Sequence, residues 1–251
     1  MSDTDNKPEK ALKKVAIVGG GPSRRRAPYH NHSWEIWAFS SRLYRYPRIT
    51  RWFELHAMTD LRQRLSTYRP GRRSYRGYMR FLRNLKCPVY MQRKHKNIPN
   101  SVVFPLKKVK AEFGRCFTSS ASYLIALAIL EGYDVIGLWG IDVRRKEYLR
   151  QRGAIKYLLG VAKKKGIKIL IARGSRIRVP ENPKPVRTRV LYAYGWRSPH
   201  AWWRYNIRRR LRLHRLRLRR LRKRRLRAQP RRLGLGPGLR LRCKQKGQRR
   251  R

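Results

Sequence analysis

The sequence predicts an α/β fold, a parallel sheet with helices on both faces, followed by a basic extension at the carboxyl end. Three observations support this prediction. Residues 121–131 form an almost wholly apolar helix, which a tight turn connects to a short apolar strand at 135–139. A β-branched run at 15–18 leads directly into three glycines. Strand-like and helix-like segments alternate up to residue 175, which is typical of a Rossmann-like sheet.

The elements follow one another as short, well-separated patterns. Strands are expected where β-branched and aromatic residues cluster, at 15–18, 34–39, 52–56, 89–91, 102–104, 135–139 and 168–171. Helices are expected at 58–67, 121–131 and 145–165. Gly132 and Gly166 follow the last two helices, where a left-handed residue commonly ends a helix.

The glycine-rich segment after the first strand is a candidate phosphate-binding turn, because bare backbone N–H groups can contact phosphates. Its residues are Gly19, Gly20, Gly21, Pro22 and Ser23. The segment is not a P-loop, and Arg24 stands where a dinucleotide-binding motif would place its third glycine. A tight turn without a ligand is therefore the alternative.

Polar residues also flank the central helix and strand. Thr118, Ser119 and Ser120 precede the helix, and their hydroxyls can satisfy the free N–H groups of its first turn. Asp142 follows the strand directly, and ligands of open α/β sheets bind outside the carboxyl ends of strands. We therefore expect the glycine turn and the helix start to share one pocket. Asp142 is expected to be functional, with a structural partner at the strand end as the alternative.

The third expected strand ends with an acid and a histidine, Glu54 and His56. Acids are scarce in this chain, so a carboxylate inside a strand is expected to be held by an arginine. His56 is a candidate catalytic base or a donor that orients a ligand, and a purely structural histidine is the alternative.

The charge of the chain favours polyanionic partners. Its 67 Lys and Arg against 12 Asp and Glu give a net charge of +55, which attracts nucleic acid or an anionic membrane surface. The first 13 residues lack the apolar region of a secretory signal, and no apolar run reaches the roughly 20 residues of a membrane span. Cys87, Cys116 and Cys243 have neither a disulfide framework nor zinc spacing. These features predict a cytoplasmic protein without a zinc site.

Composition divides the chain into four parts. Residues 1–13 are expected to be a flexible arm, 14–178 a Rossmann-like nucleotide-binding domain, 179–203 a linker with prolines and tryptophans, and 204–251 a basic tail. The tail has 23 Lys and Arg and no acid, and its leucines are spread around a helical wheel. It is expected to bind DNA or RNA without sequence preference, and an extension without a selected role is the alternative.

Aromatic residues alternate with arginines inside the expected domain, at Tyr68, Tyr75, Tyr78 and Phe81. Such mixing suits base stacking and phosphate contact. A surface lid whose aromatic rings pack inward is the alternative.

Three motifs together resemble a known protein group. They read Val-Gly-Gly-Gly-Pro-Ser at 18–23, Thr-Ser-Ser at 118–120, and Gly-Tyr-x-x-Ile-x-Leu-x-Gly-Ile-Asp at 132–142. Over about residues 14–175 the chain resembles the Rossmann-like group that contains the bacterial lipooligosaccharide sialyltransferases, the hydroxymethylpterin diphosphokinase-like proteins and uncharacterised phage proteins. The Trp-Phe-Glu-Leu-His strand is most similar to the phage members.

The resemblance implies a nucleotide site. The glycine turn would line the phosphates, Thr118–Ser120 would contact the nucleotide or donor sugar, and Gly140 and Asp142 would form the floor of the cleft. Ser40 or Ser41 stands where the sialyltransferases carry an asparagine. Their catalytic histidine follows the Gly-Ile-Asp strand, but residues 143–148 contain none, so Glu147 or His56 would have to supply the base.

The first interpretation is therefore a phage-encoded, nucleotide-binding, glycosyltransferase-like enzyme that uses a nucleotide or nucleotide-sugar donor. A diphosphokinase of the same fold is the second interpretation, with Asp142 and Glu54 helping to hold Mg²⁺ through phosphates. The third is a non-enzymatic polyanion-binding protein, in which the sheet is a scaffold for the tail.

Overall fold

The computed structural model of the 251-residue chain describes residues 11–39, 45–66, 74–142 and 149–194, together with 214–216, 218 and 221. The chain divides into two compact units, Met1–Pro199 and His200–Arg251. In the second unit the described residues are helical, and the leucines among them are exposed. Among the described residues, no helix is long and apolar enough to cross a membrane.

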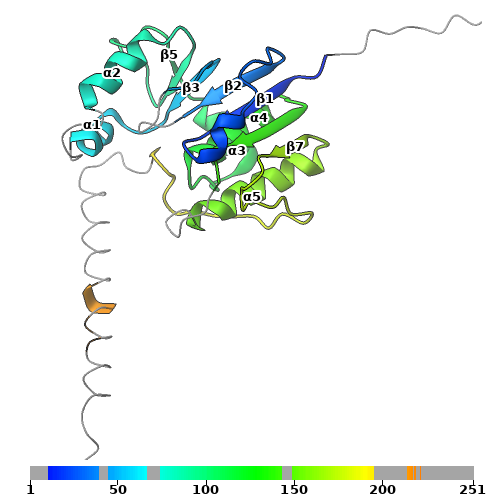
Figure 1. The fold of residues 1–251 in the computed structure, drawn as a ribbon. Helices are drawn as coiled ribbons and strands as arrows, with labels where there is room; N and C mark the ends of the chain where they lie inside the picture. The colour runs from blue at the N-terminus through cyan, green and yellow to red at the C-terminus, as the bar shows by residue number, and fades with distance from the viewer. Residues whose placement is uncertain are drawn as a thin grey trace, which may run out of the picture. The chain divides into compact units, whose positions relative to one another are not determined.

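The first unit is built on one sheet, shown in Figure 1. Its strands are β1 (Lys14–Val18), β2 (Trp34–Ala38), β3 (Arg51–Glu54), β4 (Val89–Met91), β5 (Ser101–Val103), β6 (Val135–Trp139) and β7 (Lys168–Ile171). Its helices are the 3₁₀ helix η1 (Pro22–Arg26), α1 (Met58–Ser66), α2 (Tyr75–Asn84), α3 (Leu106–Phe113), α4 (Ser120–Leu130) and α5 (Leu149–Lys164).

The sheet has the strand order β5-β4-β3-β2-β1-β6-β7, and every neighbouring pair is parallel. The chain builds outward from β1 to β5 on one side and then returns to add β6 and β7 on the other. The order therefore reverses between β1 and β6, which is the topological switch point where ligands of such sheets bind. The predicted α/β, Rossmann-like class is confirmed.

Helices cover both faces of the sheet, as expected. Val15 and Ile17 of β1 face a core that α3, α4 and α5 complete. The alternate residues Ala16 and Val18 face the opposite side, because successive side chains of a strand point to opposite faces. There, the connection between η1 and β2 covers β1, and α1 and α2 cover β2, β3 and β4 (Figure 1).

Helix α4 is buried around almost its whole circumference, which explains its lack of a polar face. It packs on the sheet and is also flanked by α3 and α5. Ser119 caps its start by a reciprocal pair of hydrogen bonds with Ser122, of 3.2 and 3.3 Å between backbone nitrogen and side-chain oxygen. Gly132, with a φ of +69°, follows its end as predicted.

Several scarce acids are used structurally at the amino edge of the sheet. Arg51 forms ion pairs with Glu35, at 2.9 Å, and with Glu131, at 2.8 Å, while its guanidinium lies over the Trp37 ring. Burial alone would raise the pKa of Glu35, but hydrogen bonds from Tyr133 and Trp37 and the charge of Arg51 bring it below 4.5. The ion pairs of Glu35 and Glu131 with Arg51 therefore hold β2, β3 and α4 together.

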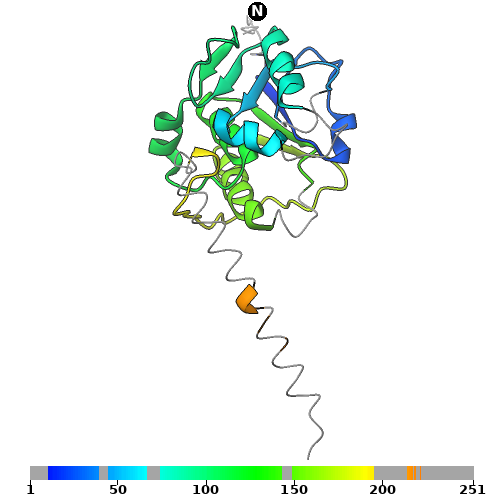
Figure 2. The same ribbon diagram turned by 90° about the vertical axis from the view of Figure 1, so that its left-hand side faces the viewer.

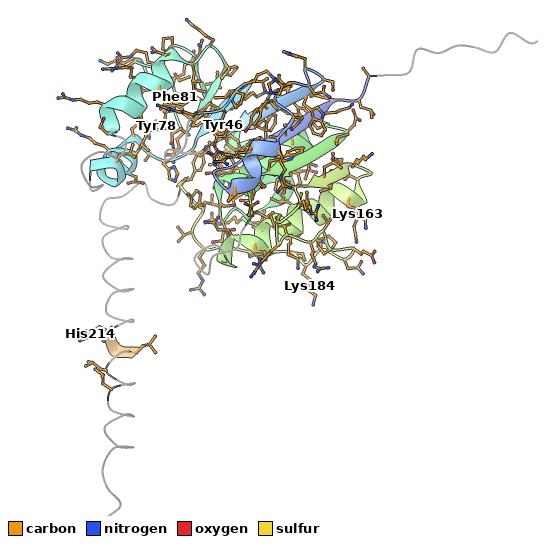
Figure 3. The ribbon with its side chains drawn as sticks, viewed as in Figure 1. Tyr46, Tyr78, Phe81, Lys163, Lys184 and His214 are labelled. Atoms are coloured by element: carbon orange, nitrogen blue, oxygen red, sulfur yellow. The ribbon has the colours of Figure 1, made fainter. Side chains whose placement is uncertain are left out.

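Helices α2 and α3 were not predicted, because glycine and basic residues interrupt their apolar patterns. Ser74 caps α2 by accepting the N–H of Gly77. Tyr78 and Phe81 of this helix, together with Tyr46, surround the ring of Trp52 (Figure 3). Tyr78 and Phe81 therefore pack inward rather than offering a stacking surface, whereas Tyr68 lies outside the described residues.

Residues 177–194, here called the strap, differ from the expected linker. Leu191, Ala193 and Tyr194 are buried in the core that contains α3 and α4. The N–H of Tyr192 donates to the carbonyl of Phe117 over 3.0 Å, which anchors the strap just before α4. Figure 2 shows the yellow end of the strap beside the green α3–α4 region. The described part of the expected linker thus belongs to the folded body, and residues 195–203 lie outside the described residues.

Candidate functional site

The turn after β1 and the end of β6 interlock at the switch point. The N–H of Gly19 donates to the carbonyl of Trp139, and the N–H of Gly21 donates to that of Gly140, both over 2.8 Å. Gly140 has a φ of +65°, a conformation that favours glycine. A Cβ on Gly21 would lie 2.6 Å from Oδ2 of Asp142. Packing inside the protein therefore explains the glycine at position 21, and a phosphate contact by this turn stays a prediction.

A hydrogen bond between Ser23 and Asp142 stabilises the same junction. The Ser23 hydroxyl donates to Oδ1 of Asp142 over 2.5 Å and accepts the N–H of Gly140 over 2.7 Å. Asp142 is only 8% exposed. Its carboxylate accepts the hydrogen bond that holds the start of η1 against β6. This is the structural role that the sequence left open as the alternative for Asp142. A catalytic role for Asp142 stays a prediction.

The start of α4 lies on the same carboxyl edge of the sheet, because α4 runs back toward the amino edge before β6 begins (Figure 1). The capping box engages the N–H groups of Ser119 and Ser122. The N–H groups of Ser120 and Ala121 also belong to the first turn, but they are not part of the box. Among the described residues, Oγ1 of Thr118 is a buried oxygen without a hydrogen-bond partner. An unpaired buried polar group costs about 1–3 kcal/mol, so a ligand atom bound there would relieve that cost.

A buried acid and a histidine are paired at the end of β3. The Glu54 side chain is 3% exposed, and its Oε1 lies 2.6 Å from Nδ1 of His56. Its Oε2 accepts the Tyr78 hydroxyl over 2.7 Å. Burial would raise the pKa of Glu54, but the neighbouring His56 and these hydrogen bonds bring it below 4.5. When His56 is neutral, the Glu54 carboxylate accepts a hydrogen bond from Nδ1–H and so favours the tautomer with its proton on Nδ1. Nε2 then has the lone pair that a base needs.

The strap supplies a tyrosine to this pair. The Tyr192 hydroxyl lies 2.9 Å from Nε2 of His56, and the two rings meet edge to face. The backbone of Tyr192 is held from both sides, because its N–H donates to Phe117 and its carbonyl accepts the Tyr123 hydroxyl over 2.9 Å. Tyr192 is therefore the third member of a Glu54–His56–Tyr192 arrangement.

Comparison with known proteins adds structural neighbours. No protein-family model and no curated protein matches the sequence. The sialyltransferase CstII from Campylobacter jejuni, solved with cytidine-5'-monophosphate, is 16% identical, with a TM-score of 0.43 over 78% of this chain and 99% of that one. Its complex with CMP-3FNeuAc is 17% identical, with a TM-score of 0.43 over 70% and 89%. An apo alpha-2,3-sialyltransferase from the same organism is 17% identical, with a TM-score of 0.40 over 72% and 82%.

In the glycine turn Pro22 is exposed, Gly20 and Gly21 are half-buried, and Gly19 and Ser23 are buried. Ser40 and Glu147 lie outside the described residues, so their predicted roles stay predictions.

The carboxylates expected to help hold Mg²⁺ are not close together. Glu54 ends β3 and Asp142 follows β6, and β2 and β1 lie between these strands. Three inter-strand spacings amount to roughly 14 Å, which is too far for one ion. Among the described residues, no group of three His, Cys, Asp or Glu side chains could hold a metal ion. The two carboxylates therefore do not bind one ion directly, and their predicted help in holding Mg²⁺ through phosphates stays a prediction.

Sequence reasoning was wrong about the partner of Glu54 and missed Tyr192. The described donors to Glu54 are His56 and Tyr78, and the expected arginine is not among them. Tyr192 lies 136 residues from His56 in the chain, inside the segment assigned to a linker. The apolar Leu-Tyr-Ala-Tyr run at 191–194 was the available signal, because such a run among prolines and arginines favours burial.

Proposed function

We propose that this chain binds a nucleotide-activated donor along the carboxyl edge of its sheet and transfers the activated group to a hydroxyl acceptor. His56 acts as the base in this reaction. The observation that carries the proposal is the buried Glu54–His56 pair, on the same edge as the switch point. The motif resemblance to nucleotide-dependent transferases points in the same direction.

The phosphate end of the donor belongs at the switch point. A helix start offers unpaired N–H groups and a partial positive charge to an anion. Here, the start of α4 contributes the N–H groups of Ser120 and Ala121 and the unpartnered hydroxyl of Thr118. Gly20, half-buried in the turn after β1, would contact the phosphate from the β1 side. These groups would stabilise the leaving nucleotide, whose charge grows as its bond to the transferred group breaks.

The spacing of the strands suits a donor that reaches from the phosphate site to His56. The ends of β1 and β3 are two strand spacings apart, which is roughly 10 Å. That span matches a phosphate joined to one further ring. The acceptor oxygen would attack the carbon of the activated group, its proton would pass to Nε2 of His56, and the nucleotide would leave with the bonding electrons.

His56 is preferred over the other candidate bases for a geometric reason. Glu54 fixes the ring and its tautomer, whereas the Asp142 carboxylate is occupied by Ser23. In the proposed complex the acceptor hydroxyl takes the place of the Tyr192 hydroxyl at Nε2. We expect the Tyr192 side chain to rotate away for this exchange while the backbone of the strap stays anchored.

A binding and turnover experiment with His56→Asn tests the proposal. Full-length protein is titrated calorimetrically with CMP, UMP, GMP and AMP, and release of nucleotide from the corresponding nucleotide sugars is followed. We expect His56→Asn to keep nucleotide affinity and to lower turnover by about 100-fold or more. His32→Asn, at an exposed histidine, is the control. Absence of binding by any nucleotide, or full turnover by His56→Asn, would show the proposal to be wrong.

We propose nucleic-acid binding by the tail as a second candidate function, which the 23 basic residues and absence of acids in 204–251 favour. Each phosphate neutralised on a duplex releases counterions, so log K should fall by about 0.9 per contacted phosphate for each tenfold rise in salt. Titration of DNA and RNA with the full chain and with a chain ending at Pro199 checks this. Equal affinities and equal slopes for the two proteins would rule out a binding role for the tail.

A further inference from the structure

A depression lined by four arginines opens at the carboxyl end of β7. Its volume is about 620 Å³, and it is lined by residues 171–178 and by Arg152 of α5. The lining segment contains Arg173, Arg176 and Arg178, and none of the described lining residues is an acid. Small-molecule sites commonly measure about 300–1,000 Å³, so the size suits a compact ligand.

The segment that carries these arginines is anchored to the switch-point elements. The Arg26 guanidinium of η1 donates to the carbonyl of Arg173 over 2.8 Å. The N–H of Arg176 donates to the carbonyl of Asp142 over 3.3 Å. The backbone positions of the arginines are thereby fixed relative to the end of β6, before any ligand arrives.

Among the described residues, no ion pair joins an acid to Arg173, Arg176 or Arg178. Asp142 turns its carboxylate to Ser23, and Glu181 is largely exposed and lies 3.8 Å from Lys163 of α5. Like charges gathered in one depression repel one another until an anion enters. Guanidinium groups match phosphate oxygens in shape and can bind them with two parallel hydrogen bonds.

We propose that this depression is a binding site for a small molecule that carries a diphosphate group. Several arginines around one concave space can engage two phosphates at once, whereas a single phosphate would use only part of the charge. The site is formed by the segment that follows β7 and by Arg152 of α5, and its lining does not include His56 or the start of α4. The inference therefore goes beyond the proposed transfer reaction and does not depend on it.

Calorimetric titration of the full chain with inorganic pyrophosphate tests the site, at an ionic strength held constant with sodium chloride. The test variant is Arg173→Gln/Arg176→Gln. The control is Lys107→Gln/Lys108→Gln on the exposed side of α3, which removes the same charge outside the depression. We expect the arginine variant to bind pyrophosphate at least about tenfold more weakly than the wild type, and the lysine variant to bind it within about twofold, because distant exposed charges are screened.

Three results would overturn the inference: no binding of pyrophosphate by the wild type, equal weakening in both double variants, or equal wild-type affinity for pyrophosphate and inorganic phosphate. Circular dichroism checks that each variant is folded, and Arg178→Gln alone replaces the arginine pair if the double variant does not fold. Because no nucleotide is used, binding of pyrophosphate here would stand even if the protein bound no nucleotide sugar.

Discussion

Replacing Glu54 by glutamine should reveal how strongly the buried carboxylate supports the fold and the His56 ring. The carboxylate accepts three hydrogen bonds, from the Tyr78 hydroxyl and from the ring and backbone N–H groups of His56. In Glu54→Gln the single amide oxygen can keep the two bonds from His56. The amide NH₂ then faces Tyr78, whose hydroxyl already accepts the indole N–H of Trp52. One charge-assisted bond is lost and a buried donor is left unpaired.

The expected cost of Glu54→Gln is about 1.5–3 kcal/mol at pH 7, since that is the range for a hydrogen bond to a charged group. For a folded unit of this size, such a loss lowers the melting temperature by about 5–10 °C. Urea denaturation and thermal melts followed by circular dichroism measure the two quantities.

The contribution of the Glu54 carboxylate to the unfolding free energy should depend on pH. The native pKa of Glu54 is below its ordinary value of 4.5, so the charged carboxylate contributes stability above that pH. This contribution disappears as the pH falls through the native pKa. The difference in unfolding free energy between wild type and Glu54→Gln should therefore shrink as the pH falls below 4.5.

The control is Glu112→Gln, at an exposed carboxylate that lies 2.8 Å from Lys165. Because exposed ion pairs contribute little, this change should cost no more than about 0.5 kcal/mol. A Glu54→Gln protein as stable as the wild type at pH 7, or a loss that is the same at pH 4 and pH 7, would refute the reasoning about the Glu54 carboxylate.

Two further changes test the junction at the switch point and the strap. Gly21→Ala places a Cβ 2.6 Å from the Asp142 carboxylate and should cost about 1–3 kcal/mol in urea denaturation. The control is Gly153→Ala, at an exposed position of α5 where the nearest neighbour of the new Cβ is 3.7 Å away, and it should be neutral or stabilising. A chain ending at Pro199 should melt like the full chain, but a chain ending at Pro183 lacks the buried end of the strap and should lose at least about 2–5 kcal/mol. Equal melting of the two truncated chains would show that the strap does not stabilise the body.

The parts of the fold that could be predicted have local signals. The run of α4 combines a polar cap, eleven helix-forming residues and a terminal glycine, all adjacent in the chain. Strand β6 follows within five residues as a short apolar run. From these elements and from β1, the carboxyl edge and the placement of the glycine turn follow by topology alone.

The parts that could not be predicted depend on contacts between distant segments. Glycine and arginine weaken the helical pattern of α2, and burial of Tyr78 and Leu82 against the sheet compensates for this. The partner of Glu54 was misassigned because composition counts charges but does not locate them. His56 meets Tyr192 only through packing of the strap. The apolar run around Tyr192 predicts burial of that segment but does not identify His56 as its partner.

The position of Tyr192 in the chain has a consequence for synthesis. The last strand, β7, ends at Ile171, and Tyr192 follows 21 residues later (192 − 171 = 21). A chain emerging from the ribosome can therefore complete its sheet, with Glu54 and His56 already paired, before it contains the tyrosine that meets Nε2. The Glu54–His56–Tyr192 arrangement is therefore completed after the sheet, and cleavage between β7 and Tyr192 would break the covalent link between the tyrosine and the sheet.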